Sequence, residues 1–319
     1  NFSVSSRAAR KIKRSEAKLL KKADLVFATS KELYNYCSRH NNNTHVFPFA
    51  VNFRAFEEAL RTDAAPEELA RIKRPIIGYV GGVHKWVDQG LIRAAAQNHP
   101  DYSFVFAGPL QTDVSLLSGL KNVYFLGSKG HERIPYLIKA FNVCIIPYVL
   151  SDYTKNVYPT KLNEYLAMGK PVVSTALPEV SEFNKKYGGV LRVAANKEDF
   201  SRCIEMAAAE NDPAAQKKRI TAAGENSWES RLAEMTDLIE REIERKKQNR
   251  EARWREDLVY FYRAARRRTL NFAALGLLLY IALFKTPLIW FLASPLKISE
   301  PPQKAEVIVV FGGGVGETG

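Results

Sequence analysis

The sequence has few residues of the kinds that form covalent or metal cross-links. It contains three cysteines in 319 residues, Cys37, Cys144 and Cys203, which lie far apart in apolar or helical surroundings. A disulfide framework or a cysteine-ligated metal site requires several cysteines at short spacings. The five histidines are also scattered without a regular spacing. We therefore expect reduced thiols in a cytosolic environment and no metal site.

Acidic residues are scarce relative to basic ones. The chain carries 47 Lys and Arg residues against 34 Asp and Glu, which gives a formal net charge of +13. Such an excess is typical of proteins that meet nucleic acid or an anionic membrane. Much of it lies in residues 1–22 and 241–268, and the second of these stretches directly precedes a long apolar run. We therefore expect anionic lipids of the inner leaflet as partners, and no nucleic acid.

The chain also lacks an initial methionine, and its last residues are a glycine-rich stretch directly after an expected strand. A chain of this length is sufficient for one or two ordinary domains. The two end features predict that it is a fragment of a longer protein.

The chain alternates between short apolar runs and helical patterns. Strands are expected at 24–30, 75–81, 102–108, 123–127, 143–148 and 189–193, helices at 5–22, 87–99, 131–141, 196–209 and 227–243, and a strand with an irregular link at 44–56. This alternation predicts an α/β fold with a doubly wound parallel sheet and right-handed crossovers. Ligands of such sheets bind at the carboxyl ends of the strands, near the point where the strand order reverses.

The segment NVYPTKLNEYLAMGKPVVST, residues 156–175, combines a helix start, a short helix and a buried strand. Pro159 suits the first helical turn, and Gly169 suits the position just after the helix. Lys161 lies in the first turn, where the helix dipole disfavours a cation unless an anion binds there. Glu164 shares its face and can accept hydrogen bonds from sugar hydroxyls. An exposed Lys–Glu pair without function is the alternative.

A glycine pair, Gly81 and Gly82, ends the strand expected at 75–81. Glycines at the carboxyl end of a strand allow the backbone to approach a ligand closely. The alternative is an ordinary turn between a strand and a helix.

The run PTKLNEYLAMGKPVVST resembles the donor-site segment of GT-B glycosyltransferases, especially the large retaining family numbered four. In that family a carboxylate and a later glutamate frame the nucleotide-sugar. The resemblance implies that Glu164 holds the ribose hydroxyls, and that the backbone amides at Thr160 and Lys161 meet the diphosphate. The first carboxylate position falls on Asn156, which departs from the family pattern and can bind a sugar only through its amide.

The run GYVGGVHKWVD, residues 78–88, resembles the glycine loop on the donor side of the same family. The resemblance implies that Gly81 and Gly82 lie against the donor and that Lys85 is the nearby cation for the diphosphate. Trp86 is expected to pack against the protein.

The resemblance covers roughly residues 24–245. It implies that residues 1–52 are the end of an N-terminal acceptor domain with its crossover. Residues 53–245 are then a Rossmann-like GT-B donor domain that binds the nucleotide-sugar. The catalytic residues are expected in the N-terminal half, outside this chain.

A basic helical stretch, residues 246–268, precedes an apolar run from Thr269 to Phe284 that continues at Leu288 to Ala293. The run is about long enough to cross a bilayer. Arginine-rich flanks mark the cytoplasmic side. We therefore expect a transmembrane helix over 269–293, with the glycosyltransferase part cytoplasmic and the C-terminal tail extracytoplasmic. A buried hydrophobic hairpin is the alternative.

The C-terminal residues 294–319 contain a proline-rich link, an expected strand and a glycine loop. This stretch resembles the opening of the SanA/ElyC-like envelope family, whose first loop is matched by Gly312–Gly314 and Glu317. The resemblance implies a truncated second α/β domain.

These resemblances imply a metal-independent, retaining glycosyltransferase of hexosyltransferase type. It would move a sugar from a nucleotide-diphosphate sugar to an envelope polysaccharide or a lipid-linked acceptor, with no cofactor. Two other hypotheses remain open. One is a sugar-nucleotide epimerase of GT-B shape. The other is a non-catalytic, membrane-tethered envelope scaffold, which the amide at Asn156 favours.

Overall fold

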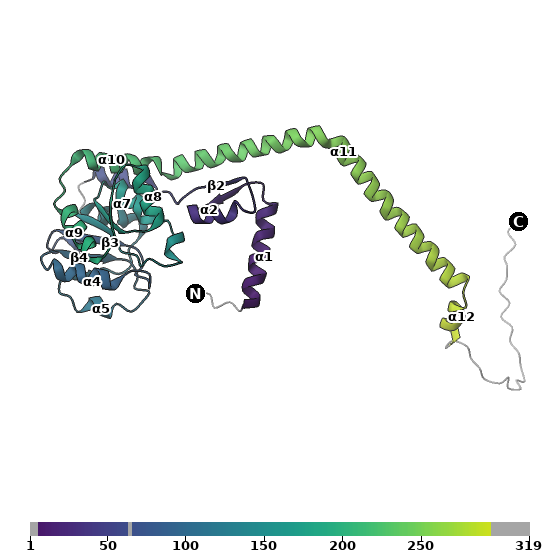
Figure 1. Ribbon diagram of the computed structural model, residues 1–319, viewed down its shortest axis with the longest axis horizontal. Helices are drawn as coiled ribbons and strands as arrows, with labels where there is room; N and C mark the ends of the chain where they lie inside the picture. The colour runs from purple at the N-terminus through teal and green to yellow at the C-terminus, as the bar shows by residue number, and fades with distance from the viewer. Residues whose placement is uncertain (1–5, 63–65, 295–319) are drawn as a thin grey trace, which may run out of the picture. The chain divides into compact units, whose positions relative to one another are not determined.

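The computed structural model describes residues 6–62 and 66–294. The chain divides into two units, residues 1–245 and residues 246–319. Figure 1 shows the first as a layered α/β body and the second as mainly one long helix. Each unit is described by itself.

The first unit is built on a parallel sheet of six strands in the order β5-β4-β3-β6-β7-β8. The strands are β3 (Ile76–Val80), β4 (Ser103–Ala107), β5 (Val123–Phe125), β6 (Val143–Ile146), β7 (Val172–Thr175) and β8 (Arg192–Ala194). The chain runs outward from β3 to β5 and then returns to β6 on the other side of β3. The strand order therefore reverses between β3 and β6, and the predicted doubly wound parallel sheet is confirmed.

Helices cover both faces of this sheet. They are α3 (Phe53–Arg61), α4 (Gln89–Asn98), α5 (Ser115–Ser118), α6 (Ile134–Ala140), α7 (Thr160–Ala167), α8 (Pro178–Lys186), α9 (Lys197–Ala208) and α10 (Pro213–Glu225), with short 3-10 turns η1 (Glu67–Leu69), η2 (His131–Arg133) and η3 (Thr154–Asn156). In Figure 1, α4 and α7 lie on opposite sides of the strands; α4 packs with α9, and α7 packs with α10. Every residue of β3, β4 and β6 is buried, because strands covered on both faces have no solvent side.

The N-terminal part of this unit contains α1 (Ser6–Lys22), β1 (Val26–Ala28), α2 (Lys31–Cys37) and β2 (Thr44–Val46). Strands β1 and β2 pair in parallel. Ser30 caps α2, because its hydroxyl accepts a hydrogen bond from the Leu33 amide at 3.2 Å. The amide of Lys31 donates to a carboxylate oxygen of Glu179 at 2.7 Å, which ties α2 to α8.

Two expected elements differ in the structure. The strand expected at 189–193 begins at Arg192, because Gly188 and Gly189 adopt positive φ angles of 63° and 83° and form a turn. The irregular link expected up to residue 56 becomes helix α3 from Phe53 onward, because that helix can bury Phe56 against the core. The three cysteines are unpaired.

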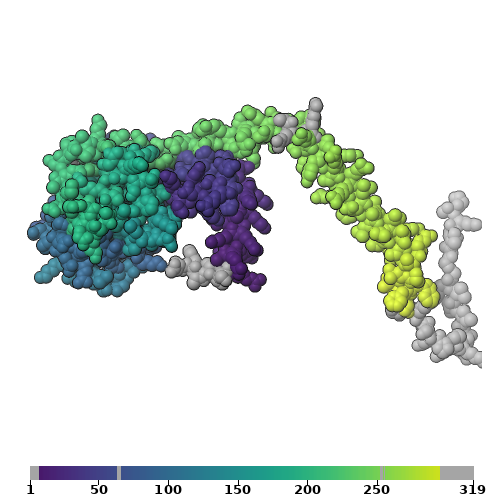
Figure 2. Space-filling view, viewed as in Figure 1, coloured from purple at the N-terminus to yellow at the C-terminus, as the bar shows by residue number. Residues whose placement is uncertain are grey.

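The second unit contains most of α11 (Trp228–Phe284) and the short α12 (Leu288–Ala293). Residues 256–284 form a helical stretch long and apolar enough to cross a membrane, and an 18-residue window within it has a mean hydropathy of 1.3. Figure 2 shows the side chains of this yellow-green stretch exposed along the helix. The apolar run predicted as one helix over 269–293 is divided in two, because Pro287 has no amide hydrogen with which to continue α11.

The predicted second α/β domain, with Gly312–Gly314 and Glu317, lies outside the described residues.

Candidate functional site

The reversal of strand order places the ends of β3 and β6 next to each other. Gly81 directly follows β3, and Tyr148 lies two residues beyond β6. Helix α7 begins at the same edge of the sheet, because a Cβ atom added to Gly81 would lie 3.3 Å from Cε and Nζ of Lys161. The structure therefore brings the predicted glycine loop and the predicted lysine together.

Lys161 is a buried cation held by aromatic rings. Its side chain is 8% exposed, and its Nζ donates a hydrogen bond to the Tyr148 hydroxyl at 2.5 Å. The same nitrogen lies 4.9 Å from the ring centre of Tyr79 and 5.0 Å from that of Tyr148. Within residues 6–62 and 66–294, no carboxylate forms an ion pair with it. The alternative of an exposed Lys–Glu pair is therefore wrong.

In the first turn of α7, the amides of Thr160 and Lys161 have no acceptor among the described residues, whereas the Leu162 amide donates to the Pro159 carbonyl at 3.0 Å. Pro159 is the cap residue and provides no side-chain acceptor to the amides that follow. Thr160, the first residue of the helix, is exposed. Unpaired amides, the positive end of the helix dipole and a lysine at one place favour an anion.

Glu164 lies one turn further along α7 and is partly buried. Its carboxylate makes no hydrogen bond with any residue in the described part of the chain. Burial raises the pKa of this carboxyl, whereas the charges of Lys161 and His131 lower it. The carboxylate is thus an acceptor left open for an external donor.

The glycine loop is closely packed. Gly81 has a φ of +121°, which L-residues rarely adopt, and a Cβ atom on Gly108 would lie 2.2 Å from the Gly81 carbonyl oxygen. The Gly82 carbonyl accepts a hydrogen bond from the Tyr79 hydroxyl at 3.0 Å. The pair is therefore more constrained than an ordinary turn, because bulkier residues would displace both the neighbouring loop and Lys161.

Two predicted residues make no hydrogen bond or ion pair with Lys161 or Glu164 in the described part of the chain. Lys85 is exposed and forms no hydrogen bond or ion pair within the described residues. Asn156 ends η3, and its Nδ2 donates to the Asp152 carbonyl at 2.7 Å. Its amide is therefore used to close a local turn.

The structure adds aromatic and histidine residues that the sequence reasoning did not select. Tyr79 and Tyr148 surround the lysine. The ring of His84 stacks on Trp86 at 3.9 Å, and both burial and the Lys161 charge lower the pKa of His84. Trp86 packs against the core as expected. Only the position of Tyr148 at the end of the strand predicted at 143–148 hinted at its role, since nothing local in the sequence links it to Lys161.

No group of three or more His, Cys, Asp or Glu residues suited to a metal occurs in residues 6–62 and 66–294. The site is instead a glycine loop, a caged lysine and an open carboxylate at the switch point of a doubly wound sheet. These features define a Rossmann-like α/β domain whose charged groups meet at the edge of the sheet where such domains bind their ligands.

Comparison with known proteins shows which Rossmann-like α/β proteins this chain is similar to. Residues 74–210 match the family described as "Glycosyl transferases group 1". The putative teichuronic acid biosynthesis glycosyltransferase TuaH of Bacillus subtilis (strain 168) is 29% identical over 228 residues. The match covers 68% of this chain and 57% of TuaH, so the chain spans somewhat more than half the length of this curated relative.

Solved structures show the same fold. Sucrose-phosphate synthase from Thermosynechococcus elongatus has a TM-score of 0.57 and 20% identity, over 75% of this chain and 64% of that one. Anabaena HepE in complex with UDP-glucose has a TM-score of 0.56 and 17% identity, over 75% of this chain and 70% of that one. The first unit therefore has a GT-B-type α/β fold, and residues 74–210 within it match the model of the group 1 glycosyl transferases.

Proposed function

We propose that the first unit binds a nucleotide-diphosphate sugar and that the complete protein is a glycosyltransferase. The observation that carries this proposal is the position of Lys161, a buried ammonium with no carboxylate partner in the described chain, at the start of α7. A buried charge without a counter-ion is costly, and an anionic ligand offsets that cost.

The diphosphate is placed at the first turn of α7. The free amides of this turn donate to phosphate oxygens, and Gly81 allows them to come close to the loop after β3. Lys161 makes a charge-assisted contact there. As the sugar leaves, negative charge grows on the diphosphate, so the lysine and the helix dipole stabilise the transition state more than the bound donor.

The ribose is placed at Glu164. Its carboxylate has no partner among the described residues and can accept two hydrogen bonds from a vicinal diol. Its distance along the helix from Lys161 is about one turn, which suits a ribose attached to a diphosphate. His131 adds a second polar group on this side.

The comparisons support the substrate class. The HepE structure was determined with UDP-glucose bound, and TuaH is described as acting in teichuronic acid biosynthesis. We therefore favour a UDP-sugar as donor and a glycan or lipid-linked envelope precursor as acceptor, with retention of configuration. No residue of this chain is assigned as a catalytic acid or base.

Membrane attachment is part of the proposal. Residues 256–284 meet the length and hydropathy of a membrane-crossing helix. The cationic side chains just before the apolar part favour a cytoplasmic position for residues 1–268 and contacts with anionic lipids of the inner leaflet.

Calorimetric titration of UDP-glucose into the full chain tests the donor site. Glu164→Gln is expected to weaken binding by about 1–3 kcal/mol. With 2′,3′-dideoxy-UDP the same substitution should have little effect, because the analogue lacks the hydroxyls that donate to the carboxylate. An equal loss with both ligands would contradict the ribose assignment.

Experiments on the same protein also distinguish a glycosyltransferase from the two other hypotheses, a scaffold and an epimerase. A non-catalytic scaffold would give no heat with any nucleotide-sugar. An epimerase would convert the bound nucleotide-sugar to an isomer, whereas a transferase of full length would release nucleoside diphosphate and form a glycosidic bond with an added acceptor.

A further inference from the structure

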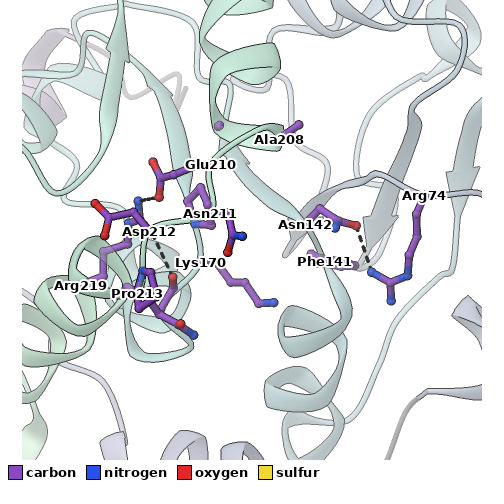
Figure 3. Close-up of a pocket in the computed structure, with 14 residues that line it drawn as sticks. Arg74, Phe141, Asn142, Lys170, Ala208, Glu210, Asn211, Asp212, Pro213 and Arg219 are labelled. Atoms are coloured by element: carbon purple, nitrogen blue, oxygen red, sulfur yellow. Dashed lines mark hydrogen bonds and ion pairs between the residues drawn. The ribbon is translucent and has the colours of Figure 1, made fainter.

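A cavity of about 230 Å³ lies at the edge of the sheet opposite the site described above. It is lined at the amino ends of three strands by Arg74 before β3, Asn142 before β6 and Lys170 before β7. Figure 3 shows these residues facing a second group formed by Glu210, Asp212 and Arg219. The sheet therefore separates this cavity from the carboxyl ends of the strands, where Lys161 lies.

The acidic residues of the cavity are already occupied. Glu210 pairs with Arg192 at 3.1 Å through one carboxylate oxygen and with Arg219 through the other. Asp212 caps helix α10, since its carboxylate accepts from the Ala214 amide at 2.8 Å. Neither residue forms an ion pair with Lys170.

Lys170 is a largely buried cation without a counter-ion. Its ammonium makes no hydrogen bond or ion pair with a residue in the described ranges 6–62 and 66–294. Burial lowers its pKa, and the nearby positive charges of Arg74 and Lys139 lower it further. Figure 3 shows its side chain extended between the group around Glu210 and the Asn142–Arg74 pair. Lys170 and Arg74 thus line the cavity as two cations that form no ion pair within the described ranges, and Asp212 is the lining acid that forms none there either.

Arg74 and Asn142 provide hydrogen-bond donors to the cavity. The guanidinium of Arg74 donates to the Ala140 carbonyl and to Oδ1 of Asn142, both at 3.0 Å. That oxygen also accepts from the Ile76 amide at 2.9 Å. The acceptor of Asn142 is thus used, while its NH₂ group has no partner among the described residues. An unpaired ammonium, a guanidinium and an amide donor together suit a tetrahedral oxyanion.

We propose that this cavity is an anion site for a phosphate group, distinct from the donor site. Lys170 provides the point charge, and Arg74 and Asn142 provide hydrogen-bond donors. The phosphate is either free or part of a small phosphomonoester, since both present the same oxygens. The proposal does not depend on the nature of the ligand at Lys161.

Titration of inorganic phosphate into the full chain by calorimetry tests it. The donor site is first disabled as an anion site by Lys161→Met. In that background one phosphate is expected to bind, and Lys170→Met should weaken its affinity by at least about tenfold, as loss of a charged hydrogen bond implies. Lys170→Arg, which keeps the charge, should stay within about threefold of the unmodified site.

A matched control tests whether the loss of affinity reflects only the general loss of one positive charge. Lys217 lies on α10, is exposed and does not line the cavity. Lys217→Met should leave the affinity unchanged. An equal loss with Lys217→Met and Lys170→Met, or no loss with Lys170→Met, would overturn the proposal. Should Lys170→Met fail to fold, Arg74→Gln at an exposed position is expected to weaken binding several-fold, and an unchanged affinity there would overturn it equally.

Two further experiments test whether the phosphate binds outside the donor site and which phosphate compound binds best. In the protein that retains Lys161, saturation with UDP should not displace phosphate. Displacement would mean that phosphate binds in the donor site, and it would refute a separate phosphate site. Tighter binding of glycerol phosphate than of inorganic phosphate would support the site and assign a phosphomonoester to it, and the reverse order would support it as a site for free phosphate.

Discussion

The ammonium of Lys161 donates to the hydroxyl of Tyr148 at 2.5 Å. This contact joins the first turn of α7 to the chain just after β6, and it holds a cation at the positive end of a helix dipole. The arrangement is unfavourable without a ligand and favourable with an anionic one. In the function proposed above, binding of an anionic donor offsets this cost to the free protein.

Substitution of Lys161 should separate stability from function. Lys161→Met keeps an aliphatic chain of similar length between Tyr79 and Tyr148 and removes the buried charge. The melting temperature of the free protein is expected to be equal or higher. Affinity for UDP should fall about 10- to 100-fold, the range for one charge-assisted hydrogen bond.

In a full-length transferase, Lys161→Met should lower kcat more than it raises KM. Lys85→Met is the comparison, and its effect on UDP affinity should be smaller because that ammonium is exposed and screened. A clear loss of stability of the free protein in Lys161→Met would mean that the lysine is structural.

The free energy of unfolding should depend on pH through the ionisation of Glu164. Burial raises the pKa of this carboxyl, so the folded protein holds the proton more tightly than the unfolded chain does. Its contribution to stability is therefore present at low pH and is lost as pH rises from the ordinary pKa of glutamate through the raised one. Glu164→Gln, which does not ionise, should be more stable than the parent above this window and equal to it below. Urea denaturation of both proteins across this pH range measures the difference, and parallel curves would show that Glu164 does not contribute it.

A methyl group at Gly81 should damage both the loop and the lysine. Gly81→Ala forces a φ of +121° on an L-residue and places Cβ 3.3 Å from Lys161. We expect a loss of about 1–3 kcal/mol in the free energy of unfolding and weaker UDP binding. Gly119→Ala is the matched control, because Gly119 has a φ of −86° and no atom within 4 Å of the added group. Similar behaviour of the two variants in denaturation and binding would argue against a role for the conformation of Gly81.

Cysteine labelling should test the sidedness of the membrane segment. In a Cys37→Ser background, single cysteines are introduced at Glu234, whose side chain is 58% exposed, and at Ser299. An impermeant maleimide added to intact cells should label Ser299→Cys only, and lysis should expose Glu234→Cys as well. Labelling of both positions in intact cells would contradict a crossing between them.

The sequence by itself determined the repeating elements of the first unit. Buried strands of β-branched residues, a proline before α7 and a glycine after it are local features, so Val172–Thr175 and the position of Gly169 were predicted correctly. The parallel order of the sheet also followed, because alternating strands and helices leave few other topologies. The resemblance around Lys161 and Glu164 pointed to the edge of the sheet at which the two glycines lie.

Only the tertiary structure decided what these residues contact. The partners of Lys161 are Tyr79 in β3 and Tyr148 just after β6, which are adjacent only because the strand order reverses between β3 and β6. Asn156 was selected because the resemblance places the family's first carboxylate there, yet its side-chain NH₂ group donates to the Asp152 carbonyl within a local turn. The burial of Lys161 results from packing across the whole sheet, so no local sequence pattern predicts it. It matters because a buried ammonium, unlike a solvated one, gains from a bound anion.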